Sequence, residues 1–405
     1  MTRAMKDSGI EWIGKIPVNW VIQKNKALFR EVNERCEDGS KYTLLSVSEY
    51  TGVTPRSAII KDGEFETHAE TLDGYKICHE DDIVMNIMLA WKRATAASSY
   101  DGIISPAYCV FRGKGVETKY YHYLFRTDNC AEMFKRYSTG IIDSRLRLYP
   151  DVFLSLKSIV PPLSEQKRIA SFLDAECARI DAVIEQTRAS IEEYKKLKQA
   201  VITRAVTKGL RPDRPMKDSG IEWIGEIPEG WKIAQLKVYA TVNSGKEIIE
   251  EVDCSDQAVP VFGSGGVFKY TTTSLYVGET VMFGRKGTLG KPIYANGKLW
   301  AVDTMYYLTF SHNLIAKFNY YQLVVFDWNK YITQTALPSI VGSEIVSCFF
   351  AFPPLFEQLD IAAFLDSECA RIDAVVEQKT NLIAELESYK KSLIFEYVTG
   401  KKEVL

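Results

Sequence analysis

Apolar residues recur at every third or fourth position along two segments of the chain, 163–209 and 355–399, and neither segment contains Pro. This spacing places the apolar side chains on one face of a helix, and a repeat of seven is typical of a coiled coil. About 45 residues at 1.5 Å each would form a helix roughly 65 to 70 Å long. The first seam consists of Leu173, Ile180, Thr187, Tyr194 and Val201, flanked by Cys177, Ile184, Ile191, Lys198 and Ala205. The second consists of Leu365, Ile372, Lys379, Leu386 and Leu393, flanked by Cys369, Val376, Ile383, Lys390 and Tyr397.

The segments that precede these helices have the pattern of mixed α/β domains with short strands. Two short apolar runs, Asp82–Met85 and Thr280–Met282, are interpreted as equivalent strands, and a loop with adjacent basic residues follows each of them. Asp-Gly and Asn-Gly dipeptides are strong signals for tight turns. The expected turns and the strands after them are 100–102 with 103–112, and 295–297 with 299–310.

The chain contains two copies of one framework. The block Met5–Trp20 returns almost unchanged at Met216–Trp231, and Phe172–Gln186 returns at Phe364–Gln378 with two differences. The residues between these blocks hardly match. A duplication that only enlarges a core would drift everywhere, so the pattern favours two different surfaces held by one frame. If a pseudo-two-fold axis relates the halves, the two helices pair antiparallel and act as a spacer, whereas a plain helical hairpin would only join another protein.

The repeats and the helix-ending run after Gly209 divide the chain into four parts. We expect a first block with its insert (1–160), a central long helix (161–210), a second block with its insert (211–352) and a C-terminal long helix (353–405).

Composition and charge narrow the class of protein. The chain has 50 Lys and Arg against 52 Asp and Glu, a net charge of −2, and neither insert is strongly basic, so any nucleic-acid affinity must come from local patches or from a complex. No run approaches the ~20 apolar residues of a membrane span, and the start lacks a signal peptide, which predicts a cytoplasmic protein. The 8 Cys residues form no C-x-x-C pair, which argues against a zinc site or a disulfide framework.

Basic clusters at three places are candidate DNA contacts. The segment 283–298 has no acidic residue, and its glycines would let the backbone approach a phosphate. Ala90–Ala94 takes the corresponding place in the first insert, and 135–147 forms a further cluster, whose two last arginines would share a strand face if extended. For any one of these loops, the alternative to a DNA contact is a solvated basic turn without a binding function. The candidates are Lys92, Arg93, Lys135, Arg136, Arg145, Arg147, Arg285, Lys286, Lys291 and Lys298.

Patterns that resemble catalytic motifs do not meet the requirements of those sites. Val261–Phe268 imitates the glycine-rich turn of methyltransferases, but the residues after it do not predict a helix. Pro292 follows Gly290-Lys291 where a phosphate-binding loop needs Ser or Thr, and the 4 His residues show no metal-binding spacing. We therefore expect no catalytic residue, cofactor or metal, and a role in binding or as a scaffold.

The framework motifs resemble those of the specificity (S) subunits of type I restriction-modification systems. The resemblance rests on MKDSGIEWIG followed by IP and Trp, on PPL-x-EQ before FLD-x-E-x-ARID, and on VTKGLRP before the second MKDSG. It covers a minority of residues spread over the whole chain. It implies two pseudo-symmetric target recognition domains of α/β (α+β) class, separated by two long antiparallel coiled-coil helices.

The same resemblance implies a non-catalytic, cytoplasmic protein that binds a bipartite double-stranded DNA sequence. Its partners would be modification (M) subunits, two per complex, and restriction (R) subunits. Two other hypotheses remain open: a coiled-coil adaptor with two protein-binding heads, and a self-contained methyltransferase or nuclease.

Overall fold

The computed structural model describes residues 3–58, 71–333, 335 and 337–404, and these divide into two compact units. Unit 1 comprises Met1–Gln186 together with Leu382–Leu405, and unit 2 comprises Thr187–Asn381. Within the described ranges, no helix is both long and apolar enough to cross a membrane.

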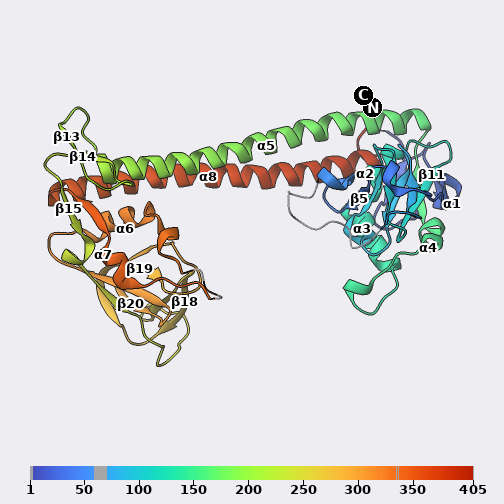
Figure 1. Cartoon of the computed structure of the whole chain (residues 1–405). Coiled ribbons are helices and arrows are strands. Elements are labelled where there is room, and N and C mark those ends of the chain that lie inside the picture. The colour runs from blue at the N-terminus through green and yellow to red at the C-terminus, as the bar shows by residue number, and fades with distance from the viewer. Residues whose placement is uncertain (1–2, 59–70, 334, 336, 405) are drawn as a thin grey trace. The chain divides into compact units, whose positions relative to one another are not determined.

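Unit 1 is built around a four-stranded antiparallel sheet with the order β4-β11-β8-β9 (Figure 1). Its strands are β1 (Met5–Asp7), β2 (Lys15–Pro17), β3 (Val21–Lys24), β4 (Phe29–Val32), β5 (Leu45–Ser48), β6 (Gly52–Pro55), β7 (Lys76–Cys78), β8 (Ile83–Asn86), β9 (Thr95–Ala97), β10 (Gly102–Ile104), β11 (Tyr108–Gly113) and β12 (Lys157–Val160). Its short helices are α1 (Asn25–Leu28), α2 (Thr118–Phe125), α3 (Asp128–Tyr137) and α4 (Pro150–Ser155).

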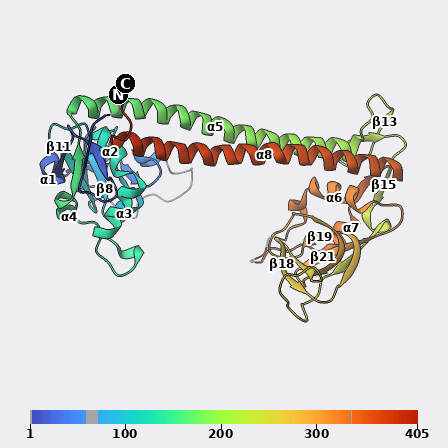
Figure 2. The same ribbon diagram turned by 180° about the vertical axis from the view of Figure 1, so that it is seen from behind.

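Unit 2 is built around a six-stranded sheet with the order β16-β21-β19-β20-β17-β18, seen from behind in Figure 2. Its strands are β13 (Met216–Asp218), β14 (Glu226–Pro228), β15 (Lys232–Gln235), β16 (Ala240–Ser244), β17 (Val259–Gly263), β18 (Gly266–Thr271), β19 (Tyr276–Gly284), β20 (Ile293–Ala301), β21 (Met305–Phe310) and β22 (Phe349–Phe352). Its short helices are α6 (Ala316–Val324) and α7 (Gly342–Ser347).

The two sheets share one topology. The order β4-β11-β8-β9 of unit 1 corresponds to β16-β21-β19-β20 of unit 2, and a helix follows the second strand of each series, α2 in one and α6 in the other. The strand that ends each insert pairs with the strand that opens it, β12 with β3 and β22 with β15. The expectation of two inserts with a common mixed fold is therefore confirmed.

The two long helices, α5 (Leu163–Lys208) and α8 (Leu355–Val398), match the predicted segments to within one residue, and each helix contributes to both units. None of the seam side chains of the seven-residue repeat is exposed. In unit 1 the start of α5 packs against the end of α8, with the rings of Phe172 and Tyr397 4.5 Å apart. The antiparallel pair is thus confirmed, and burial of its apolar face is the main source of its stability.

Polar residues that interrupt the seam are paired across it. In unit 1 the Nζ atom of Lys390 lies 2.6 Å from a carboxylate oxygen of Asp181, and in unit 2 Lys198 makes the same contact with Asp373. The two aspartates occupy the same place in the repeated ARID motif. The ion pairs between the two helices therefore follow the internal repeat of the sequence.

A carboxylate, buried in unit 1 and half-buried in unit 2, joins each framework block to its helix. Glu165 accepts hydrogen bonds from Arg3 Nη1 at 2.6 Å and from Trp20 Nε1 at 3.0 Å. In unit 2, Glu357 accepts from Arg214 Nη1 at 2.9 Å and from Trp231 Nε1 at 2.7 Å. These contacts explain why the blocks around both tryptophans repeat so closely.

The C-terminal residues of the chain contact the first framework block and α2. Lys401 Nζ donates to the carbonyl oxygen of Ile13 at 2.7 Å, and Tyr120 Oη donates to that of Val398 at 2.7 Å. The N- and C-terminal segments consequently lie side by side within unit 1 (Figure 1).

Some of the sequence-based predictions of turns and strands are wrong. Residues 295–297 form no turn but lie inside β20, where Gly297 has a φ of +109° and pairs with Gly278, whose φ is +135°. Because both paired residues are glycines, they can adopt positive φ angles and the strands continue through a backbone conformation that would normally end them. The expected strand 103–112 is divided into β10 and β11 around Pro106, and 299–310 is divided into β20 and β21.

We predict that Glu165→Gln lowers the free energy of unfolding by about 2 to 3 kcal/mol, because it leaves a half-buried Arg3 without its counter-charge. Glu357→Gln should act equally on unit 2 through Arg214. A suitable control is Glu176→Gln, since Glu176 pairs with Arg179 on the exposed helix surface and should contribute less than ~1 kcal/mol. Urea unfolding of the purified chain measures all three. Equal losses in the three variants would contradict a structural role for the buried carboxylates.

Candidate nucleic-acid interface

The connection after the central strand of each sheet occupies the same topological place in both units. It runs from β8 to β9 over residues 87–94 in unit 1 and from β19 to β20 over residues 285–292 in unit 2, so the two connections are equally long. Because the two connections are equally long, Arg93 of unit 1 corresponds in position to Lys291 of unit 2, and Ile87 corresponds to Arg285. The expected correspondence between the loop that contains Lys92 and Arg93 and the loop within 283–298 is therefore seen in the topology of the two units.

A second loop lies beside this connection in both units. In unit 1, Thr139 and Arg147 exchange two backbone hydrogen bonds of 2.9 and 3.0 Å and close the loop between them. In unit 2, the backbone N–H of Thr333 donates to the carbonyl oxygen of Ser339 at 3.0 Å. We name the connection and the closed loop together the two-loop surface of each unit: 87–94 with 139–147 in unit 1, and 285–292 with the described residues 333, 335 and 337–339 in unit 2.

One backbone hydrogen bond joins the two loops at matching positions. The N–H of Leu148 donates to the carbonyl oxygen of Ile87 at 2.8 Å, and the N–H of Ile340 donates to that of Arg285 at 3.0 Å. The same construction is therefore present twice. Sequence reasoning found the loop of unit 1 by its charges but missed the loop of unit 2, which has no charged residue; its only signal was its position before the strand that ends the insert.

Arg285 combines a fixed backbone with a free side chain. Its N–H donates to the carbonyl oxygen of Thr304 at 2.8 Å, and its own carbonyl accepts from Ile340. The side chain is exposed, and among the described residues no carboxylate pairs with it. A guanidinium held in this way can form a bidentate contact with a guanine edge or a phosphate without first breaking an ion pair.

The glycines of this connection allow it to pack closely. At Gly290, where φ is +69°, an added Cβ would lie 3.1 Å from the Cβ atom of Trp328. Lys286 and Lys291 are exposed on either side of the glycines. Lys298 differs from these residues because it lies within β20, opposite Val277, and so belongs to the sheet rather than to the loop.

In unit 1, two of the lysines that were predicted to contact DNA lie near one indole ring. The Nζ atoms of Lys92 and Lys135 lie 5.2 and 4.9 Å from the ring centroid of Trp91. Lys135 also pairs with Asp143 at 3.0 Å. Arg93, which has a φ of +68°, pairs with Asp128 at 2.9 Å. Lys135 and Arg93 are thus partly neutralised within the fold, and Lys92 is the freer cation.

A buried arginine supports this connection from below. Arg126 donates from Nη1 to the carbonyl oxygen of Arg93 at 2.7 Å and from Nη2 to that of Tyr50 at 3.0 Å. Burial lowers the pKa of Arg126 to about 10 and that of the neighbouring His122 to about 3. His122 is accordingly neutral at physiological pH and adds no charge to the surface.

The remaining predicted cations of the first insert lie in two different surroundings. Arg145 ends a 3₁₀ turn, Asp143–Arg145, and Arg147 Nη1 donates to its carbonyl oxygen at 3.2 Å, so the two do not share a strand face as expected. The reason is that the loop bends back instead of continuing as a strand. Arg145 itself is exposed.

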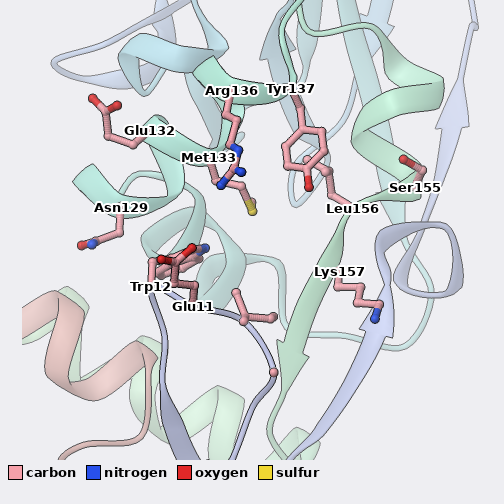
Figure 3. Close-up of a pocket in the computed structure, with 12 residues that line it drawn as sticks. Glu11, Trp12, Asn129, Glu132, Met133, Arg136, Tyr137, Ser155, Leu156 and Lys157 are labelled. Atoms are coloured by element: carbon pink, nitrogen blue, oxygen red, sulfur yellow. The ribbon is translucent and has the colours of Figure 1, made fainter.

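Arg136 instead lines a cavity of about 810 Å³ between the first framework block and α3. Figure 3 shows Arg136, Met133 and Tyr137 extending from α3 over this space, opposite Trp12 and Lys157. The indole Nε1 of Trp12 is buried there without a hydrogen-bond partner in the described part of the chain.

The sequence pattern that imitates a methyltransferase motif lies in the sheet of unit 2. Residues 261–268, which resemble a methyltransferase motif, span the end of β17, the turn and the start of β18, and do not open a helix. In the ranges that the structure describes, no group of three or more His, Cys, Asp or Glu is arranged to hold a metal ion.

The comparisons with known proteins agree on one family. The family described as "Type I restriction modification DNA specificity domain" matches residues 228–388. The type I restriction enzyme MjaVIII specificity subunit of Methanocaldococcus jannaschii is 24% identical, and the alignment covers 96% of this chain and 94% of the relative.

Two solved structures share the fold at 16% identity. One, described as "Structural basis underlying complex assembly and conformational transition of the type I R-M system", has a TM-score of 0.72 and covers 96% of this chain and 99% of its own. The other, the HsdS subunit from Thermoanaerobacter tengcongensis, has a TM-score of 0.55 and covers 96% and 98%. The repeated framework, the paired long helices and these matches lead to one conclusion: the chain contains a region that matches the type I restriction modification DNA specificity domain, and it is similar to type I specificity subunits over nearly its whole length.

Proposed function

We propose that the chain is the DNA specificity subunit of a type I restriction-modification complex and that each insert reads one half of a bipartite duplex target. The observation that carries this proposal is the two-loop surface, which is built twice on one framework from different side chains. A repeated frame with divergent loops suits a target whose two halves differ. Similarity to type I specificity subunits favours this function over an adaptor or a self-contained enzyme.

The predicted cations are proposed as the DNA contacts. The exposed ones on the two-loop surfaces, Lys92, Arg145, Arg285, Lys286 and Lys291, are the strongest candidates because no carboxylate of the described chain pairs with them. Arg147 lies at the closure of its loop. Arg93, Lys135, Arg136 and Lys298 are secondary candidates, since each is paired with a carboxylate or lies outside the two-loop surface.

The framework is proposed as the docking surface for partner subunits. Two modification subunits would bind equivalent surfaces formed by the framework blocks and the long helices, because a repeated partner needs a repeated surface. Restriction subunits would complete the complex. In this proposal the chain itself is non-catalytic, needs no cofactor and acts in the cytoplasm, while its partners carry the chemistry.

The four-part division of the sequence is proposed as the functional one. Residues 1–160 and 211–352 would each form a framework block with a target recognition domain, and 161–210 and 353–405 would form the helices that set the gap between the half-sites. Support comes from α5 and α8, each of which contributes residues to both units.

We predict that Arg285→Ala weakens specific DNA binding by about 1 to 3 kcal/mol and relaxes specificity at one base pair if the guanidinium reads a base. Lys269→Ala is the control, because Lys269 lies in β18 and is paired with Glu251 at 2.6 Å. Binding of the complex with its modification subunits should be measured at constant salt, on the mapped target and on single-base variants. A uniform loss on all sequences would assign Arg285 to a phosphate, and no loss would exclude it from the interface.

Lengthening both helices should change the gap of the target. Duplicating Ile180–Gln186 and Ile372–Gln378 together adds one heptad to each helix and restores the same seam. Seven residues at 1.5 Å add about 10 Å, which corresponds to roughly three base pairs. A genome-wide methylation map should show the same half-sites with a longer gap. Methylation at the original gap would rule out the helices as the spacer.

A further inference from the structure

The closed loop of each two-loop surface presents an aliphatic side chain at its tip. Ile141 is 97% exposed and Ile142 is 55% exposed, and in the matching loop of unit 2 Leu337 is 62% exposed. Single exposed apolar residues are ordinary. Here, however, the feature recurs in the corresponding loop of two inserts that share little sequence.

The tip in unit 1 is held away from the core by its own loop. Gly140 approaches the backbone so closely that an added Cβ would lie 2.5 Å from the carbonyl oxygen of Arg145. The ion pair between Lys135 and Asp143 links the loop to α3. Figure 1 shows the segment after α3 extending outward from the body of unit 1. Ile141 is therefore fixed in an exposed position and is not poised to fold back.

The surroundings of the tips indicate what they contact. Exposed Arg145 lies in the same loop as Ile141, and Arg285 is joined by a backbone hydrogen bond to the residue that follows the loop of Leu337. These cations suit phosphates, which an aliphatic side chain cannot bind. The apolar parts of DNA are the base faces and the methyl group of thymine, and isoleucine and leucine contact both in known types of complex.

We propose that Ile141, with Ile142 beside it, and Leu337 in the matching loop enter a groove of the DNA and contact bases through apolar surface. This inference rests on the proposed function and adds to it a second mode of recognition, in which the arginines hold the backbone and the tips touch the bases. Two base features can supply the contact, a thymine methyl group or a base step that opens to admit the side chain.

The first test compares Ile141→Asn with Ile249→Asn. Ile249 is 85% exposed, close to the 97% of Ile141, but it lies outside both two-loop surfaces, so it is a matched control. In the complex with its modification subunits, Ile141→Asn should raise the Kd for the mapped target about 5- to 100-fold and leave the Kd for scrambled duplex unchanged. Ile249→Asn should change neither. Leu337→Asn should repeat the effect, and its loss should map to the other half-site.

The second test identifies the base feature. Replacing each thymine of the half-site by uracil removes only the 5-methyl group, and 2-aminopurine at each step reports unstacking by its fluorescence. A thymine contact predicts that one uracil weakens binding by the native complex but not by the Ile141→Asn complex. A wedge predicts that one 2-aminopurine brightens with the native complex only.

The outcomes separate this inference from the function on which it rests. If the native complex discriminates its target and Ile141→Asn and Leu337→Asn do so equally well, the tips contact no base and the inference alone is overturned. If Ile141→Asn binds fewer modification subunits and keeps its DNA affinity when saturated with them, the tip is a protein contact and the inference is likewise overturned. If the native complex shows no sequence preference, both the function and the inference fail.

Discussion

The first turn of each long helix contains a carboxylate, buried in α5 and half-buried in α8, on which the rest of the arrangement depends. Glu165 and Glu357 each accept hydrogen bonds from the tryptophan of the framework block and from an arginine just before the block, and so tie block and helix together. A carboxylate is expensive to bury unless charge and hydrogen bonds compensate it, so the block, the arginine and the glutamate must be present together. This interdependence explains why the framework is nearly identical in the two halves while the inserts differ.

A frame fixed in this way leaves the inserts free to change their side chains. Both sheets keep one strand order, and both two-loop surfaces keep one connecting hydrogen bond, from Leu148 to Ile87 and from Ile340 to Arg285. These contacts use only the backbone. The position of each loop therefore survives replacement of the side chains it presents, which suits loops that present different surfaces on one frame.

Much of the architecture could be predicted from the sequence because it rests on periodicity and repetition. The seven-residue seams gave the limits of α5 and α8, and the repeated blocks gave the pseudo-symmetry. The turn expected at Asn296-Gly297 is not formed, and its absence could not be predicted because it depends on Gly278 in the partner strand. Two further features depend on the folded structure. One is the positional correspondence of Arg285 in unit 2 to Ile87 in unit 1, and the other is the ion pair between Arg93 and Asp128. The uncharged loop of unit 2 was missed because the search followed charge, whereas its apolar tip and its backbone bond are visible only in the structure.

The most direct test of the central claim, that each insert independently reads one half of the target, is an exchange of one insert. Residues 21–160 would be replaced by the corresponding insert of a relative with a different target, and the methylated sites would be mapped across the genome of a host that expresses the modification subunits. The account predicts that one half-site changes while the other half-site and the gap stay the same. A change in both half-sites, or in neither, would contradict it.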